Sequence, residues 1–293
     1  MGLMALTALS RLNPTKTVGT MHTLNLAQAT IYYETHEAAT ACEHPPLMLV
    51  AGLASDSQSW LPVMIKTLSQ DRLVITLDNR GCGRTTHDGD VTIEQMASDC
   101  IALADHLGIT QLDMLGHSMG GMIALTVARL YPDRLHRLVL CNSSMRQSAR
   151  NRRLFDDWAD AYTADGPNAT WYRSVFYWLL TAEFFEQPTM LDDLVQMVLA
   201  YPHPPSAEGY RQQGQAIARF DASAWLGDIH TSTLVLAGEV DLLFPPGEDA
   251  SGLAAIPHAQ VKVLPGQSHS MPMLAPGQLL EAIAPFLGKE TSA

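Results

Sequence analysis

The sequence is poor in cysteine, and the few cysteines it has do not suggest a site. They lie far apart, with no Cys-x-x-Cys pair and no Cys/His spacing of the kind that ligates zinc. These residues are Cys42, Cys82, Cys100 and Cys141. A zinc site and a disulfide framework are therefore excluded as the basis of the fold, and we expect reduced, largely buried thiols.

Positive charge and long apolar runs are also scarce. The 293 residues carry a formal net charge of −12, which repels phosphate backbones and anionic lipids, so neither nucleic acid nor a membrane surface is an expected partner. No apolar run is long enough to span a bilayer. The first residues lack the basic start and sustained apolar stretch of a signal peptide. The prediction is a cytoplasmic protein with an N-terminal extension over residues 1–20.

What the chain does contain is apolar sequence for a large core, since 47% of its residues are hydrophobic. Short runs rich in β-branched residues recur between longer helical patterns, which is typical of strands and helices that alternate around a mostly parallel sheet. The runs are 31–33, 47–50, 73–77, 112–115, 135–140, 233–237 and 261–264. An α/β core over residues 21–144 and 226–293 is predicted.

One interval, residues 145–225, breaks the alternation, because it shows only helical patterns interrupted by prolines. It holds 14 of the 20 Phe, Trp and Tyr residues of the chain. A small helical subdomain needs large side chains to build its own core, which explains most of these rings. We predict that this interval is an inserted helical cap, a lid over the substrate. The candidate substrate contacts are Trp158, Phe176 and Trp178 of the cap, with Trp60 of the core.

A glycine-rich turn is the central chemical signal. Gly116-His117-Ser118-Met119-Gly120-Gly121 follows a strand pattern directly and precedes a helix pattern directly. Side chains two residues either side of the serine would collide with the neighbouring strand and helix, so glycine is needed there. The spacing predicts that the Ser118 hydroxyl stands exposed above the sheet as a nucleophile.

Serine is a weak nucleophile at neutral pH, so it requires a base and a carboxylate that orients this base. His269 follows the run 261–264 in the sequence Pro265-Gly266-Gln267-Ser268-His269. Such a loop lies at the carboxyl end of a strand, the edge where an open parallel sheet presents its ligand site. Of the eleven histidines, only His269 is placed in this way, and it is the predicted base.

The acid is expected in the loop after the run 233–237. Glu239 and Asp241 both lie there, and Asp241 is favoured because Glu239 falls at the end of the strand itself. The preceding strand offers no acid, because Asn142 and Ser143 stand at its end. Ser118, His269 and Asp241 are thus the predicted catalytic residues.

On these motifs, the span from about Met21 to Leu287 resembles the α/β-hydrolase superfamily, in its capped, esterase-like and enol-lactonase-like branch. The segment 78–85, Asp-Asn-Arg-Gly-Cys-Gly-Arg-Thr, is similar to the family's turn after the fourth strand. The resemblance implies a mostly parallel, eight-stranded sheet flanked by helices, and no cofactor or metal. It leaves Arg80 as a structural hydrogen-bond donor or a substrate contact. Haloalkane dehalogenases and epoxide hydrolases share the fold but need an aspartate where Ser118 stands.

The resemblance also implies an oxyanion hole, two backbone N–H groups that stabilise the negative oxygen of the tetrahedral intermediate. They map to Met119, after the nucleophile, and to Leu53, in the loop after the third strand. Many family members have His-Gly where this chain has Ala51-Gly52. Because the donor is a backbone group, loss of that histidine does not remove it.

The predicted function is cleavage of a small apolar carboxylic ester or lactone through an acyl-enzyme. Three alternatives stay open: a C–C bond hydrolase with the same triad, a cofactor-free perhydrolase or haloperoxidase, and a small-molecule receptor without turnover. A basic cluster at the start of the cap is either a solvated helix face or a docking patch for an acidic substrate or carrier protein. It comprises Arg146, Arg150, Arg152 and Arg153.

Overall fold

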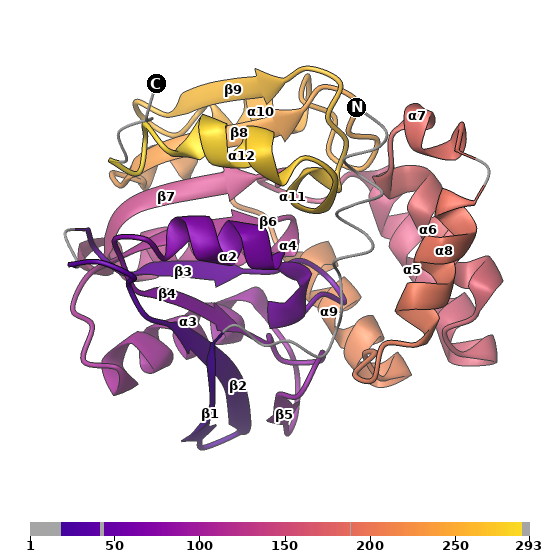
Figure 1. Ribbon diagram of the computed structural model, residues 1–293, viewed down its shortest axis with the longest axis horizontal. Helices are drawn as coiled ribbons and strands as arrows, with labels where there is room; N and C mark the ends of the chain where they lie inside the picture. Colours follow the sequence, from indigo (N-terminus) through magenta and orange to yellow (C-terminus); the bar gives the residue numbers. More distant parts are fainter. Residues whose placement is uncertain (1–18, 42–43, 188, 289–293) are drawn as a thin grey trace.

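The computed structural model describes residues 19–41, 44–187 and 189–288. Cys42 and nearly all of the predicted N-terminal extension over residues 1–20 lie outside them. Within the described residues, nine strands form one sheet in the order β1-β2-β4-β3-β6-β7-β8-β9, and the short β5 pairs with β2 (Figure 1). The strands are β1 Thr20–Leu26, β2 Ala29–His36, β3 Leu47–Val50, β4 Val74–Leu77, β5 Thr86–His87, β6 Leu112–His117, β7 Leu135–Cys141, β8 Ser232–Gly238 and β9 Gln260–Leu264.

The sheet is mostly parallel. β1, β2 and β5 are joined by antiparallel pairs and β2 runs antiparallel to β4, whereas all pairs from β4 to β9 are parallel. The central strands read as continuous apolar runs because helices cover both of their faces. The predicted α/β fold is confirmed. Its eight strands form the path of the sheet, and the two-residue β5 is an addition too short to leave a hydrophobic pattern.

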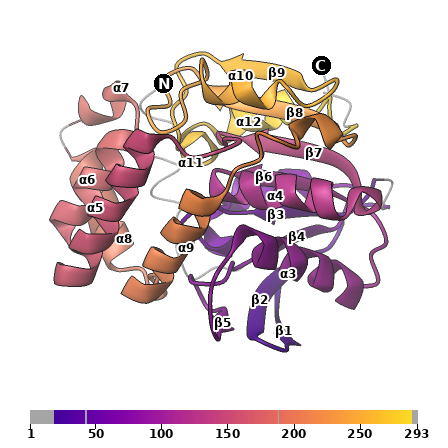
Figure 2. The ribbon, with the colours of Figure 1, turned by 180° about the vertical axis from the view of Figure 1, so that it is seen from behind.

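Helices pack on both faces of the sheet (Figures 1 and 2). Leu47 and Leu49 of β3 point into a core shared with α2 and α12, while Met48 and Val50 point into a core shared with α3 and α4. This alternation is the period of two expected of a strand. The helices of the core are α2 Pro62–Leu68, α3 Ile93–His106, α4 Met119–Leu130, α10 Asp249–Leu253, α11 Met271–Leu274 and α12 Pro276–Ile283, with short 3₁₀ turns η1 Ser57–Ser59, η2 Pro132–Arg134 and η3 Leu226–Asp228.

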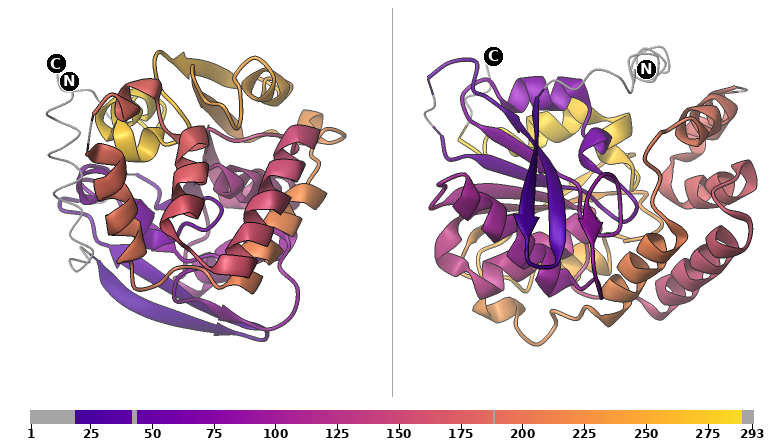
Figure 3. Two further views of the ribbon diagram at one scale, coloured as in Figure 1. Left: turned by 90° about the vertical axis from the view of Figure 1, so that its right-hand side faces the viewer. Right: turned by 90° about the horizontal axis from the view of Figure 1, so that it is seen from below.

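Further helices lie between β7 and β8, within the interval predicted as a cap. They are α5 Ala149–Asp165, α6 Ala169–Leu179, α7 Ala182–Phe185, α8 Met190–Leu199 and α9 Ala207–Arg219. They stand beyond the carboxyl ends of the parallel strands (Figures 1 and 3). The segment leaves and rejoins the core at one point, where Ala222 N–H donates to Met145 O over 2.8 Å and Arg146 forms an antiparallel bridge with Asp221. No helix in the described part of the chain is both long and apolar enough to cross a membrane.

Candidate active site

Ser118 lies on the sharp turn between β6 and α4. Its φ of 56° and ψ of −122° are in a region that side chains rarely adopt and that persists only where the surroundings enforce it. A Cβ atom on Gly116 would lie 2.2 Å from Gly120 O, and one on Gly120 would lie 2.0 Å from Val50 O. The glycines of the motif therefore allow the helix, the strand and β3 to approach closely, and this packing holds the turn.

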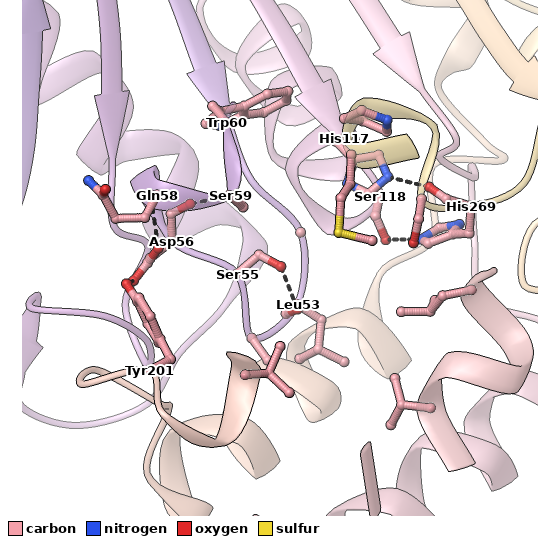
Figure 4. A pocket seen from close by; sticks show the side chains of 18 of the residues that line it. Leu53, Ser55, Asp56, Gln58, Ser59, Trp60, His117, Ser118, Tyr201 and His269 are labelled. Carbon is pink, nitrogen blue, oxygen red and sulfur yellow. Dashed lines mark hydrogen bonds between the residues drawn. The ribbon is translucent and has the colours of Figure 1, made fainter. Parts of the chain in front are cut away.

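The three predicted catalytic residues come together at the carboxyl edge of the sheet. Ser118 Oγ lies 3.0 Å from His269 Nε2 (Figure 4), and His269 Nδ1 lies 2.8 Å from Asp241 Oδ2. Because a carboxylate only accepts, Nδ1 carries the proton and Nε2 is free to accept from the serine hydroxyl. All three side chains are buried. A continuous hydrogen-bonded chain thus runs from the hydroxyl to the carboxylate.

Backbone donors hold the carboxylate in place. Asp241 Oδ1 accepts from the N–H groups of Leu243 and Phe244, over 2.9 and 3.0 Å. Glu239, the rival acid, instead accepts from Gly266 N–H on the exposed side of the loop. Geometry therefore separates two acids that lie two residues apart in the sequence.

Asn142 joins the two loops that carry Asp241 and His269. At the end of β7 it accepts from Gly238 N–H over 2.8 Å, and it donates to the carbonyl oxygens of Ser268 and His269 over 2.8 and 3.0 Å. It is fully buried, with a positive φ of 46°. In the sequence, Asn142 only excludes an acid at this strand end. In the structure it braces both loops, and no motif signals that role.

His117 supports the same loop from the side of the nucleophile. Its Nε2 lies 2.9 Å from His269 O, so this nitrogen carries the proton. Burial, followed by the neighbouring His269, lowers the pKa of His117 to about 3. The ring therefore stays neutral at physiological pH and adds no charge next to His269.

The backbone N–H groups of Leu53 and Met119 face no partner in the part of the chain that the structure describes. Met119 opens helix α4, and the first N–H groups of a helix have no partner within it. The Leu53 loop approaches the nucleophile closely, because a Cβ atom on Gly52 would lie 3.0 Å from Ser118 Cβ. Their assignment as oxyanion donors stays a prediction.

A cavity of about 390 Å³ opens at Ser118 and His269. Trp60, Trp158 and Phe176 line it, as predicted from the sequence, but Trp178 does not. The Trp178 ring lies 5.1 Å from the Arg150 guanidinium instead. The apolar wall also includes residues that were not predicted as substrate contacts. Helical periodicity does not show which side of a helix faces the cavity, and loop residues carry no such pattern. These residues are Leu53, Phe155, Trp171, Val175, Leu179 and Leu243.

The far end of the cavity is acidic (Figure 4). Asp56 and Glu34 line it, and Arg84 lies 3.8 and 3.7 Å from their carboxylates while it binds Asp78 at 2.9 Å. Tyr201, just after α8, donates its hydroxyl to Asp56. Burial, followed by the charge of Asp78, raises the pKa of Asp56 to about 6. No motif in the sequence indicates this network, which joins the core to the inserted helices.

The other predicted arginines have structural contacts. Arg80 forms a buried, two-pronged ion pair with Asp99 over 2.6 and 2.9 Å and is not among the residues that line the cavity. All four arginines of the basic cluster are exposed, although Arg150 donates to Leu242 O and Arg152 donates to Gln147 O. A docking patch at these arginines stays a prediction. In the described residues, no group of three or more His, Cys, Asp and Glu side chains is placed to hold a metal ion.

Comparison with known proteins agrees with this architecture. The family model described as the alpha/beta hydrolase fold matches residues 45–276. A protein of Pseudomonas syringae pv. syringae (strain B728a), named "Putative carbamate hydrolase RutD", is 29% identical over 267 residues that cover 89% of this chain and 100% of that protein. The structure of a malate-bound thermophilic esterase from Thermogutta terrifontis has 28% identity and a TM-score of 0.78, and covers 92% of this chain and 98% of that one. A hydrolase from Pseudomonas aeruginosa PA01, at 23% identity, shares the fold with a TM-score of 0.80 and covers 93% and 100%.

Proposed function

This chain is a member of the α/β-hydrolase fold family, and on that premise we propose that it is a serine hydrolase that cleaves a carboxylic ester or lactone through an acyl-enzyme. The observation that carries the proposal is the buried chain of hydrogen bonds from Ser118 through His269 to Asp241. This arrangement suits acyl transfer, because it joins a nucleophile to a base and the base to an orienting acid.

In the proposed reaction, Ser118 Oγ attacks the substrate carbonyl while His269 Nε2 takes the hydroxyl proton. The imidazolium that forms is stabilised by Asp241, whose other oxygen is held by two backbone N–H groups. His269 then gives the proton to the leaving alcohol, and an acyl-Ser118 ester remains. Water, activated by the same histidine, attacks this ester, releases the acid and restores the serine.

The negative oxygen of each tetrahedral intermediate would be bound by the N–H groups of Leu53 and Met119. Support comes from the close approach of the Gly52 backbone to Ser118 and from the absence, within the described residues, of any partner for either N–H. One such donor typically stabilises the transition state by about 3 kcal/mol. The substrate carbonyl would therefore lie between β3 and the start of α4.

The wall of the cavity points to the class of substrate. Aromatic and aliphatic side chains from α5 and α6 surround the space next to Ser118, and such a wall favours an apolar acyl or alcohol group. We propose that the inserted helices act as the cap over this group. The volume of about 390 Å³ fits a substrate of modest size, not a polymer or a long lipid.

Hydrolysis of a carbamate is a second candidate, because relatives with 27% to 29% identity over nearly their whole length are named carbamate hydrolases. Ser118 could attack a carbamate carbonyl in the same way, and His269 could give its proton to the leaving alcohol or amine. The carbamate nitrogen makes that carbonyl less reactive than the carbonyl of an ester. The apolar wall next to Ser118 favours a carbon-linked acyl group over a bare carbamate.

The test is steady-state hydrolysis of p-nitrophenyl esters from acetate to decanoate, with p-nitrophenyl N-methylcarbamate as the carbamate with the same leaving group. We expect turnover with a chain-length optimum, and a loss of at least about 10³-fold in kcat for Ser118→Ala. Faster turnover of the carbamate than of every ester would favour the second candidate. Undiminished turnover by Ser118→Ala would exclude both.

A further inference from the structure

We propose that Gln213, on the inserted helix α9, is a positioning residue that fixes the loop with the oxyanion donor Leu53. The inference rests on the proposed function, because it assigns a task within that acyl transfer. Gln213 is 0% exposed, and both ends of its amide contact the core. Its Oε1 accepts from Ala54 N–H over 2.9 Å, and its Nε2 donates to Arg80 O over 2.7 Å. A side chain of the insert thus holds two core loops together.

The contact with Ala54 falls on the strained part of the loop. Ser55 N–H donates to Gly52 O over 3.2 Å and closes a tight turn, with Ala54 in its third position at a φ of 58°. Glycine or asparagine is usual at a positive φ in this position. Alanine there is costly and persists only where the surroundings hold it. The bond from Gln213 supplies such a restraint.

The bond from Gln213 restrains the peptide unit between Leu53 and Ala54. Rotation of this unit would relieve the strain of the positive φ at Ala54. Turning the unit between Leu53 and Ala54 brings the φ of Ala54 to a negative value, which alanine prefers. That rotation moves Ala54 N–H away from Gln213 Oε1 and changes the backbone at Leu53, whose own N–H is the proposed donor. Gln213 therefore stabilises the turn that carries Leu53 and that approaches Ser118 through Gly52.

The other end of the amide is anchored just as firmly. Arg80 is fixed by its buried ion pair with Asp99. Next to it, Gly81 and Gly209 let α9 touch the turn backbone to backbone, since a Cβ atom on Gly209 would lie 2.2 Å from Gly81 O. Gln213 lies one helical turn after Gly209. The contact between Gly209 and Gly81 therefore sets the distance of Gln213 from the loop that carries Leu53 and Ala54.

The expected effect is selective for the transition state. Loss of one oxyanion donor lowers kcat by about 10²- to 10³-fold. A donor that is present but misplaced should lower kcat by a smaller factor. We therefore expect Gln213→Leu, which removes both hydrogen bonds at similar volume, to lower kcat by about 10- to 100-fold and to change KM by less than about threefold. Gln212→Leu is the matched control, because Gln212 is next on the same helix and contacts His87 instead.

Two inhibitors separate positioning from simple loss of structure. A trifluoromethyl ketone that matches the best ester forms a tetrahedral adduct with Ser118, and its oxyanion needs the hole. The corresponding methyl ketone binds without that adduct. Gln213→Leu should weaken the first in proportion to its loss of kcat and leave the second unchanged, and Gln212→Leu should affect neither. An unchanged kcat, or an equal weakening of both ketones, would overturn the proposal.

A second variant decides the question if Gln213→Leu does not fold. In Gln213→Glu, the neutral carboxylic acid can still accept from Ala54 N–H and donate to Arg80 O, whereas the carboxylate cannot donate. The kcat of this variant divided by that of the wild type should therefore fall as pH rises from 6 to 9. A ratio that does not change with pH would contradict the proposed role of the two hydrogen bonds of residue 213. Failure of the proposed function itself would show differently, as wild-type turnover that survives Ser118→Ala.

Discussion

The strand-end loops and the inserted helices meet around one cavity but are held by different forces. In the loops, polar side chains are fixed by short hydrogen bonds to backbone groups: Asp241 accepts from two N–H groups, and Asn142 binds Gly238, Ser268 and His269. In the insert, rings pack on rings, with Tyr162, Trp171 and Tyr210 in mutual contact at centroid distances of 4.8 to 5.4 Å. Directional bonds define positions to fractions of an ångström, whereas ring packing mainly fills volume.

This difference separates two properties of the proposed enzyme. The reaction would depend on the loops, where backbone geometry leaves little freedom. The choice of substrate would depend on the insert, where a ring can be replaced without moving the nucleophile. Hydrogen bonds such as that of Gln213 are the exceptions that cross from one region to the other.

The largest expected effect tests the loops. Asp241→Asn keeps an oxygen for Leu243 and Phe244 but can present its NH₂ group to His269 Nδ1. The imidazole would then carry its proton on Nε2 and could not accept from Ser118. We expect kcat to fall by about 10⁴-fold, measured on the best ester. Glu239→Gln, two residues away, should stay within about threefold of the wild type. The reverse ranking of the two variants would refute the assignment of the acid.

The next effect tests the insert. Phe176 and Phe184 belong to one apolar cluster and are both buried, but only Phe176 lines the cavity. Truncation of either to alanine should lower the free energy of unfolding by about 3–5 kcal/mol. Phe176→Ala alone should also shift the preference between long and short esters, by about tenfold. Thermal melts and the ratio of kcat/KM for two chain lengths check this. Equal shifts in both variants would mean that the insert has no defined substrate wall.

The smallest effect tests the contact between the regions. Because the pKa of Asp56 is raised from 3.8 to about 6, the folded state keeps a proton that the unfolded chain has lost. Its contribution to stability is therefore full below about pH 4 and is lost as pH rises through 6. Asp56→Asn cannot ionise, so its unfolding free energy should gain about 2 kcal/mol relative to the wild type between pH 4 and 6. Denaturant unfolding of both proteins at pH 4 and pH 6 measures this difference. An equal change in unfolding free energy for the variant and the wild type would contradict the raised pKa of Asp56. Tyr201→Phe, which removes a hydrogen bond that favours the carboxylate, should steepen the dependence.

The sequence predicted which strand-end residues lie together more easily than how the inserted helices face, for a physical reason. Ser118, Asp241 and His269 each follow a buried strand, and parallel strands bring their carboxyl ends to one edge. A strand pattern and a short motif therefore suffice to place them. Trp178, predicted as a substrate contact, does not line the cavity. A ring in a helical pattern can face the cavity or another part of the protein, and the pattern alone does not show which.

Contacts between distant loops leave no local signal. Gln213 binds Ala54 across 159 positions of the chain and Tyr201 binds Asp56 across 145, and neither pair belongs to a recognisable motif. The role of Asn142 also has no signal in the sequence. Its partners are backbone groups, which every residue type carries. Only the fold brings these partners together.

The inserted segment leaves and rejoins the core at one hydrogen-bonded pair. This joint affects how the length and sequence of the insert can vary. Ala222 N–H donates to Met145 O over 2.8 Å. The core therefore has to bridge the same short distance whatever the length of the segment between these two residues. The entropic cost of closing a longer or shorter segment varies only slowly with its length. We therefore expect that segments from distant relatives can be grafted at this joint, provided that each graft keeps Gln213 and its bonds to Ala54 and Arg80. A library of such chimeras would vary the wall of the cavity while Ser118 keeps its place.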